Sequence, residues 1–266
     1  MSTSANFVGS VPKFYDQGLG PVLFSHFAED MCRRVANGDP SSVLELAAGT
    51  GIVTELLSDK LTPSAKLIAT DLNQPMLNVA QQKLEGDVRC EFKVADALNL
   101  PFDAPTFDRV ACQFGIMFFP DKLQSLKEAH RVLMPGGQYI FNVWTGWENN
   151  PIAQVAHNTI AKFFEGDPPK FFEVPFGYHD IDTIETLALE AGFSAVENIT
   201  VQHDAPIKDI AQLSKALVYG NPIREEVLAR DGDPIEVVNS LELSMRKAFG
   251  KTKQAPLEAI VFTATK

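Results

Sequence analysis

Residues 41–51, with the sequence SSVLELAAGTG, limit the possible folds of this chain more than any other stretch. The apolar residues predict a buried strand, and the glycines after them predict a sharp turn into a helix that begins near Ile52. Glu45 lies at the end of the strand, and the first turn of the helix offers unpaired N–H groups to a ligand. Such a turn fits an α/β fold with a nucleoside cofactor. The dinucleotide fingerprint needs a third glycine where Thr54 stands, so the motif of hydride-transfer enzymes is not present.

The composition is that of an ordinary globular protein. With 266 residues, of which 45% are hydrophobic, the chain can bury the core of one large α/β domain with an elaboration. A formal net charge of −11 argues against nucleic acid or an anionic membrane surface as the main partner, because both need a basic face. The N-terminus lacks the features of a signal peptide, and no apolar run approaches the roughly 20 residues of a membrane span. We therefore expect a cytoplasmic protein without stable membrane insertion.

Cysteine usage indicates neither a disulfide framework nor a zinc site. Cys32, Cys90 and Cys112 are odd in number, widely spaced and without a C-x-x-C pair. We expect buried free thiols.

Strand and helix patterns alternate along the first half of the chain. Strands are predicted at 66–71, 90–94, 107–112 and 138–143, and helices at 54–61, 74–84 and 122–133. This alternation predicts a parallel doubly wound sheet with its ligands at the carboxyl ends of the strands.

The second half adds a helix and two strands. A helix is predicted over 182–191, with Asp182 and Glu185 spaced as a capping box, and strands at 196–201 and 257–263. Two insertions remain, at about 145–180 and, mainly helical, at 206–254.

The glycine turn resembles the first motif of the Rossmann-like S-adenosylmethionine-dependent methyltransferases, acid-x-Gly-x-Gly-x-Gly. Glu45, Ala47, Gly49 and Gly51 match it, and Ala47 departs from it by one methyl group, which implies slightly less room beside the methionine part of the cofactor. Asp71 ends the second strand, where the resemblance implies hydrogen bonds from the ribose hydroxyls. A helix N-cap is its alternative role.

Three later segments strengthen the resemblance. Asp96 and Ala97, in the sequence VADA, stand where the family holds the adenine, and Gln113 and Phe114 stand beside the methionine moiety. The segment 128–137, EAHRVLMPGG, resembles the family's helix and Pro-Gly-Gly turn before the fifth strand. Together these motifs resemble the subgroup with ubiquinone/menaquinone-type C-methyltransferases and many small-molecule enzymes.

An N-terminal segment, VPKFYD at 11–16, resembles the lid of that subgroup and makes Tyr15 a candidate contact of the cofactor, with plain packing as its alternative. The cofactor-binding residues implied by the resemblance are Tyr15, Glu45, Ala47, Gly49, Gly51, Asp71, Leu72, Met76, Asp96, Ala97, Gln113 and Phe114. The cofactor implied is S-adenosyl-L-methionine, with S-adenosyl-L-homocysteine as its product.

The resemblance also implies the organisation of the chain. We expect an α/β, doubly wound, mostly parallel seven-stranded sheet with an antiparallel last strand, and a mainly helical cap formed by the insertions. Lid helices would occupy 1–40, the cofactor-binding core 41–144, 181–205 and 255–266, and the cap 145–180 and 206–254. The oligomeric state stays open, with a homodimer among the alternatives.

Methyl transfer from a sulfonium is an in-line displacement in which positioning supplies much of the catalysis, and no metal is required. A general base can assist it, and His157 and His179 are the weak candidates because they lie in the first insertion. Aromatic residues gather in and before this insertion, so we expect Phe118, Trp144 and Trp147 to hold a small hydrophobic or aromatic acceptor, with a core of the cap itself as the alternative. A cofactor-binding protein without methyl transfer, one with a non-methyl reaction, and an NAD-type oxidoreductase are the other hypotheses.

Overall fold

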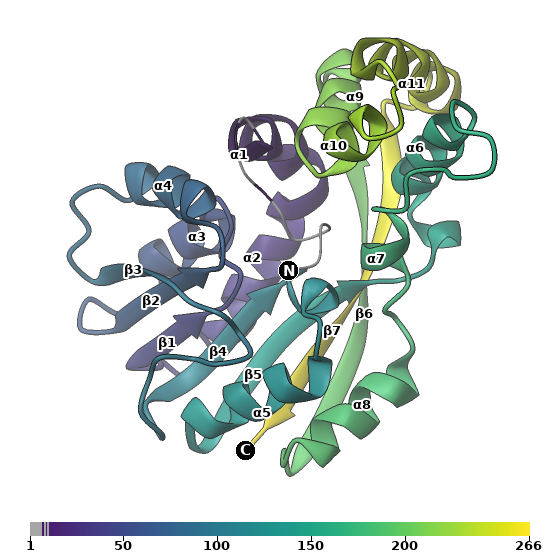
Figure 1. Ribbon diagram of the computed structural model, residues 1–266. Helices are drawn as coiled ribbons and strands as arrows, with labels where there is room; N and C mark the ends of the chain where they lie inside the picture. Colours follow the sequence, from purple (N-terminus) through teal and green to yellow (C-terminus); the bar gives the residue numbers. More distant parts are fainter. Residues whose placement is uncertain (1–6, 8, 10) are drawn as a thin grey trace.

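The computed structural model describes Phe7, Gly9 and residues 11–266, and a single sheet of seven strands runs through it (Figure 1). The strand order is β3-β2-β1-β4-β5-β7-β6. The strands are β1 (Ser42–Glu45), β2 (Lys66–Asp71), β3 (Cys90–Val94), β4 (Phe107–Gln113), β5 (Leu133–Trp144), β6 (Ala195–Pro206) and β7 (Gln254–Thr265). Strand β7 is antiparallel to both neighbours, whereas the other neighbouring pairs are parallel. The predicted fold class is confirmed.

Side chains alternate between the two faces of the sheet, so the central strands bury residues on both sides. One face is covered by α2 (Ser25–Val35) and α3 (Ile52–Lys60), where Val43 and Ile140 join Met31 and Leu57 in one apolar cluster. Helices α5 (Lys122–Val132) and α8 (Ile181–Glu190) cover the other face, seen in front in Figure 1. Helix α4 (Gln74–Lys83) packs beside β2 and β3.

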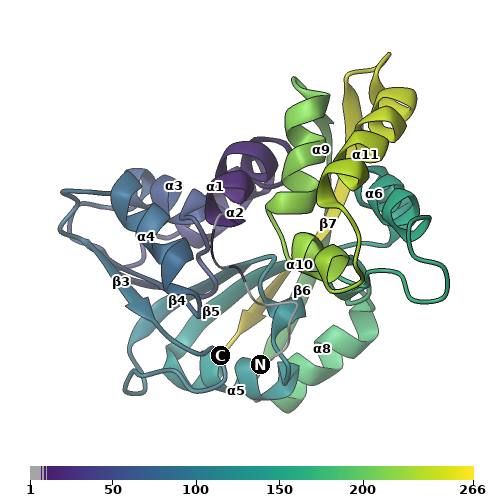
Figure 2. The same cartoon turned by 45° about the horizontal axis from the view of Figure 1, so that its top comes forward.

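Lid and cap segments lie beyond the sheet layers. We keep the name lid for α1 (Val11–Phe14) and the π-helical η2 (Tyr15–Phe24), which lead into α2; the lid predicted at 1–40 also contained α2. The cap contains η4 (Trp147–Asn149), α6 (Pro151–Ala161), α7 (Glu173–Phe176), α9 (Ile210–Tyr219), α10 (Ile223–Leu228) and α11 (Pro234–Phe249). Figure 2 shows α6, α9, α10 and α11 as one group at the ends of β6 and β7, and η2 packs against α9. Residues 1–6, 8 and 10 of the predicted lid lie outside the described residues.

Two local predictions need correction. Strand β5 begins at Leu133, so the Pro-Gly-Gly turn predicted before the strand lies within it. The turn interrupts the pairing with β4: Phe107 lies opposite Leu133, and Arg109 lies opposite Gln138. The N-cap residue of α8 is Asp180, whose carboxylate accepts a hydrogen bond from the Thr183 N–H at 2.8 Å. The predicted Asp182–Glu185 capping box is therefore wrong.

The cysteines are free. Cys32 and Cys112 are buried as expected, whereas Cys90 is only half-buried. No helix in the described part of the chain combines the length and apolarity needed to cross a membrane.

Candidate active site

Two cavities adjoin at the carboxyl ends of β1, β2 and β4. The polar cavity, of about 1090 Å³, is lined by the glycine turn and by residues that follow β2 and β3. The apolar chamber, of about 680 Å³, is lined by the lid, the cap and the end of β5. Both volumes include the solvent at the mouth of the cavity. The cavities share the rings of Phe7, Tyr15, Phe114 and Phe118, so these aromatics form the junction between them.

The turn after β1 approaches the polar cavity with its backbone. Ala47 and Gly49 both line the cavity and both have a left-handed backbone, with φ of 52° and 58°. Ala47 accepts a conformation that costs an L-residue roughly 1–2 kcal/mol. Gly51 lies outside the lining and has a packing role, because a Cβ atom there would lie 2.7 Å from the Ala80 Cβ of α4.

Asp71 connects the glycine turn to the end of β2. Its Oδ2 accepts a hydrogen bond from the Gly49 N–H at 2.9 Å, and its Oδ1 accepts one from the Asn73 N–H at 2.8 Å. Burial raises the pKa of this carboxyl, and the hydrogen bonds from Asn73 and Gly49 oppose the rise. The N-cap residue of α4 is Asn73, so the alternative of an Asp71 cap finds no support. The Asp71 side chain instead lines the polar cavity.

Glu45 lies beneath the turn and outside the lining of the polar cavity. The side chain is 2% exposed, and its Oε2 accepts a hydrogen bond from the Thr54 hydroxyl at 2.7 Å. Burial raises the pKa of Glu45 to about 8, against the lowering effect of the Thr54 bond. Glu45 is therefore a mostly neutral acid at pH 7.

The remaining wall of the polar cavity contains Leu72, Met76, Asp96, Ala97 and Gln113. The Asp96 carboxylate also accepts a hydrogen bond from the Leu98 N–H at 2.9 Å, which makes it a turn former as well as a lining residue. Gln113 donates its amide N–H to the Phe24 carbonyl at 3.3 Å, while its buried Oε1 has no hydrogen-bond partner in the described structure. This oxygen offers a free acceptor to a ligand with a donor group.

Phe114 stands at the junction in a strained conformation. Its φ is 51°, which is unusual for a bulky residue and is found where surrounding contacts hold the backbone. The Asn142 side chain supplies one such contact, because its Oδ1 accepts a hydrogen bond from the Phe114 N–H at 2.8 Å. The Phe114 ring stacks on Trp144 with centroids 3.9 Å apart. The sequence prediction missed Asn142, whose signal is a lone amide within an apolar strand.

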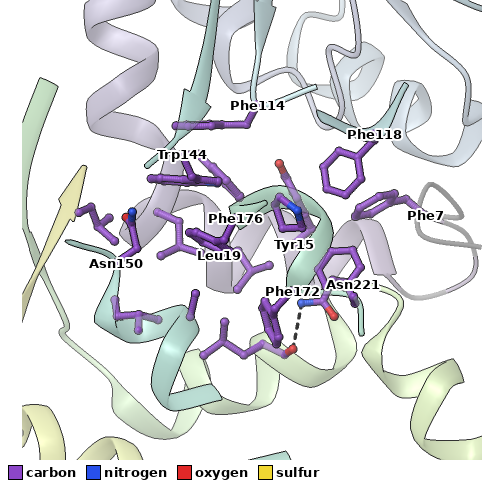
Figure 3. Close-up of a pocket in the computed structure, with 18 residues that line it drawn as sticks. Phe7, Tyr15, Leu19, Phe114, Phe118, Trp144, Asn150, Phe172, Phe176 and Asn221 are labelled. Atoms are coloured by element: carbon purple, nitrogen blue, oxygen red, sulfur yellow. Dashed lines mark hydrogen bonds between the residues drawn. The ribbon is translucent and has the colours of Figure 1, made fainter. Parts of the chain in front are cut away.

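The apolar chamber brings together rings from four segments, which are the lid, the loop after β4, the end of β5 and the first insertion (Figure 3). The first insertion supplies Phe171, Phe172 and Phe176, and the loop after β4 supplies Phe118, whose ring stacks on Phe171 at 5.9 Å. Among the described residues, no Asp, Glu, Lys, Arg or His side chain lines the chamber. Burial raises the pKa of the Tyr15 hydroxyl, so this group is a neutral phenol.

Of the residues predicted for acceptor binding or catalysis, three lie outside both linings. Trp147 packs behind the chamber wall, with its ring 5.2 Å from that of Phe176 and 5.0 Å from that of His157. His157 is half-buried, and His179 is exposed. Nowhere in the described ranges do three His, Cys, Asp or Glu side chains gather as a metal site.

Comparison with known proteins gives consistent matches. Residues 23–165 match the model of the ubiE/COQ5 methyltransferase family. The demethylmenaquinone methyltransferase of Lactococcus lactis subsp. lactis is 34% identical over 169 residues, which cover 59% of this chain and 67% of that protein. The ubiquinone/menaquinone biosynthesis C-methyltransferase UbiE of Hahella chejuensis is 38% identical over 125 residues, which cover 46% of this chain and 49% of that protein.

Solved structures match the fold over most of the chain. The YcgJ protein from Bacillus subtilis superposes with a TM-score of 0.59 at 18% identity, covering 91% of this chain and 98% of that one. The phosphoethanolamine N-methyltransferase 2 of Haemonchus contortus, solved with phosphomonomethylethanolamine and S-adenosylhomocysteine, gives a TM-score of 0.62 at 17% identity, covering 96% of this chain and 56% of that one.

Proposed function

Because the chain belongs to the ubiE/COQ5 methyltransferase family and is an S-adenosylmethionine-dependent methyltransferase, we propose that its acceptor is a small hydrophobic or aromatic molecule held in the apolar chamber. The observation that supports this is the junction, where four aromatic rings belong to both cavities. A cofactor in the polar cavity would therefore meet an acceptor in the chamber without crossing bulk water.

The polar cavity fits the cofactor by the chemistry of its donor set. Asp71 would accept hydrogen bonds from the ribose hydroxyls, and Asp96 with Ala97 would hold the adenine. The unpartnered Gln113 Oε1 would accept a hydrogen bond from the ammonium group of the methionine part. Tyr15 would close over the cofactor from the lid. Glu45 and Gly51 would act indirectly, by holding the turn in its shape.

The apolar chamber would supply positioning and exclude water. When bound, S-adenosylmethionine supplies a sulfonium methyl group for in-line displacement by a nucleophile. The chain's part is to hold the acceptor in line, which can contribute on the order of 7–11 kcal/mol to lowering the barrier. Because the described chamber wall carries no ionised side chain, we propose that a hydroxyl nucleophile loses its proton to water before the lid closes, without His157 or His179, so that the anion would face the positive charge of the sulfonium.

The proposed domain organisation matches the two cavities, with the core around the polar cavity and the lid and insertions around the apolar chamber. We propose that the lid and the insertions 145–180 and 206–254 form a cover over the core, since each supplies rings or aliphatic side chains to the chamber wall. Closure of such a cover would remove water from the displacement.

Two measurements test the proposal. Calorimetry with S-adenosylhomocysteine and with NADH should give heat of binding for the first ligand and none for the second. A screen with labelled S-adenosylmethionine over phenols, quinols and amines should give turnover concentrated among apolar aromatic acceptors. Turnover restricted to strongly charged acceptors would contradict the proposed function, because the chamber wall offers them no counter-charge.

A further inference from the structure

We infer that Asn221 sets the acceptor specificity of the apolar chamber, by donating a hydrogen bond to an oxygen substituent remote from the methylated position. This inference rests on the proposed function, because it concerns an acceptor in the same chamber. It narrows the substrate class to aromatic rings that carry such an oxygen. Asn221 lies in the second insertion, between α9 and α10, and outside the 23–165 segment that matches the family model.

Two asparagines line the chamber, whose other polar side-chain groups are the Tyr15 hydroxyl and the Trp144 indole N–H. The hydrogen-bonding groups of one asparagine, Asn150, are all used by the fold. The Asn150 amide N–H groups lie near four oxygens, at 3.1–3.3 Å, which belong to Thr145, Gly146 and Glu258. The Asn150 Oδ1 accepts a hydrogen bond from the Glu258 N–H at 3.1 Å. Asn150 thus joins the end of β5 to β7 and has no N–H left for a ligand.

The hydrogen-bonding capacity of the Asn221 side chain is only partly used by the fold. Its side-chain N–H donates to the Leu217 carbonyl at 2.9 Å, and its Oδ1 accepts from the Ile223 N–H at 3.0 Å. A carbonyl only accepts and a backbone N–H only donates, so these two partners fix the orientation of the amide. The second amide N–H has no acceptor among the described residues. Asn221 is 3% exposed, so this hydrogen is kept from bulk water within the wall of the chamber.

An unpaired N–H in an apolar wall discriminates between ligands. A buried donor left without a partner loses the free energy of its hydration, so a ligand that supplies an oxygen there is favoured over one that supplies a methylene. Figure 3 shows Asn221 beside Phe172, on the side of the chamber opposite Phe114. Since Phe114 belongs to the junction, the oxygen would lie at the far end of the acceptor from the reacting atom.

The experiment uses two nearly isosteric probes, 6-methoxy-2-naphthol and 6-ethyl-2-naphthol, which differ by one ether oxygen. Their dissociation constants are measured by calorimetry with the full chain saturated with S-adenosylhomocysteine. We expect the methoxy compound to bind about tenfold more tightly, the effect of roughly one hydrogen bond. Asn221→Ala should bring the ratio close to one. Asn221→Asp is the second variant, because it keeps an oxygen for the Ile223 N–H while it removes both amide hydrogens.

Asn150→Ser is the matched control, since Asn150 has a structural role in the same wall. It should lower the stability of the fold and leave the ratio of the two dissociation constants unchanged. Equal binding of both probes by the wild-type protein, or an unchanged ratio in Asn221→Asp, would overturn the role of Asn221 and leave the proposed function intact. Failure of both naphthols to bind would overturn the apolar acceptor site itself, and the inference with it.

Discussion

Replacement of Glu45 by Gln should make the protein more stable at alkaline pH. The buried carboxyl has a folded-state pKa of about 8, raised by burial from an ordinary 4.5. Between these two values the native state holds a proton that the unfolded chain has lost, so stability falls as the pH rises through this window. Glutamine has nearly the shape of the neutral acid and cannot ionise. Its amide oxygen can accept the same hydrogen bond from Thr54.

The magnitude follows from the two pKa values. A gap from 4.5 to about 8, at about 1.4 kcal/mol for each pH unit, gives a limit of about 5 kcal/mol. Between about pH 5 and about pH 9, the titration of this one group should cost the wild-type protein about 4 kcal/mol of unfolding free energy. Glu45→Gln should remove this part of the decline. Asp71, whose pKa is also raised, leaves a decline of the same sign in both proteins.

Urea unfolding in a series of buffers from about pH 5 to about pH 9 measures the difference between the two proteins directly. Thr54→Val provides a directional control, because the hydroxyl of Thr54 holds the pKa of Glu45 down. In Thr54→Val the folded-state pKa of Glu45 should rise further, so the decline should continue to a higher pH than in the wild-type protein. Parallel stability curves for the wild-type protein and Glu45→Gln would refute the reasoning, since they would mean that Glu45 is already ionised in the folded protein at pH 5.

Asp71→Ala should weaken the binding of S-adenosylhomocysteine by about 1.5–3 kcal/mol in calorimetry and leave the protein folded, whereas unchanged affinity would remove Asp71 from the ribose site. Phe118→Ala should reduce single-turnover methyl transfer far more than cofactor affinity, because its ring stacks on Phe171 in the chamber wall and offers the cofactor no polar atom; an equal loss of both would mean that the ring only supports the fold. Trp147→Ala, behind the wall, should lower unfolding stability more than it lowers turnover, and a selective loss of turnover would show that the ring reaches the acceptor. Asn142→Ala should destabilise the fold by about 1–3 kcal/mol in urea, because it leaves the buried Phe114 N–H without an acceptor; an unchanged midpoint would mean that other contacts hold the strained backbone.

The sequence was a good guide to the fold because its signals are local. The strand Lys66–Asp71 is bounded as predicted, since alternating β-branched and apolar residues end there at an acid followed by turn residues. The N-cap residue of α8 was predicted two residues too late. Asp180 and Asp182 can both accept a hydrogen bond from the first turn of a helix, and only the backbone geometry selects between them. The sequence patterns indicated that the insertions form helices. They did not indicate how these helices pack over the sheet, because that packing depends on contacts between residues far apart in the chain.

The lining of the polar cavity was predicted more fully than the lining of the apolar chamber. Glycines and acids at strand ends are fixed to one edge of a parallel sheet, so their neighbourhood follows from topology. The chamber instead combines η2 with loops and cap helices, and no periodicity indicates which ring of an aromatic cluster faces a cavity. Trp144 and Trp147 are alike in the sequence, yet one lines the chamber and the other supports Phe176 from behind.

The place of β7 in the sheet bears on how the chain reaches its folded state. It lies between β5 and β6, although its residues follow both in the sequence, on the order of a hundred residues after the end of β5. During synthesis, the apolar edge of β5 therefore stays without its neighbour until residues 254–265 leave the ribosome, which makes it a template for wrong pairing. Residues 206–254 are joined to the sheet through β6 and β7, so the chamber wall that they supply can be completed only when this last strand is inserted.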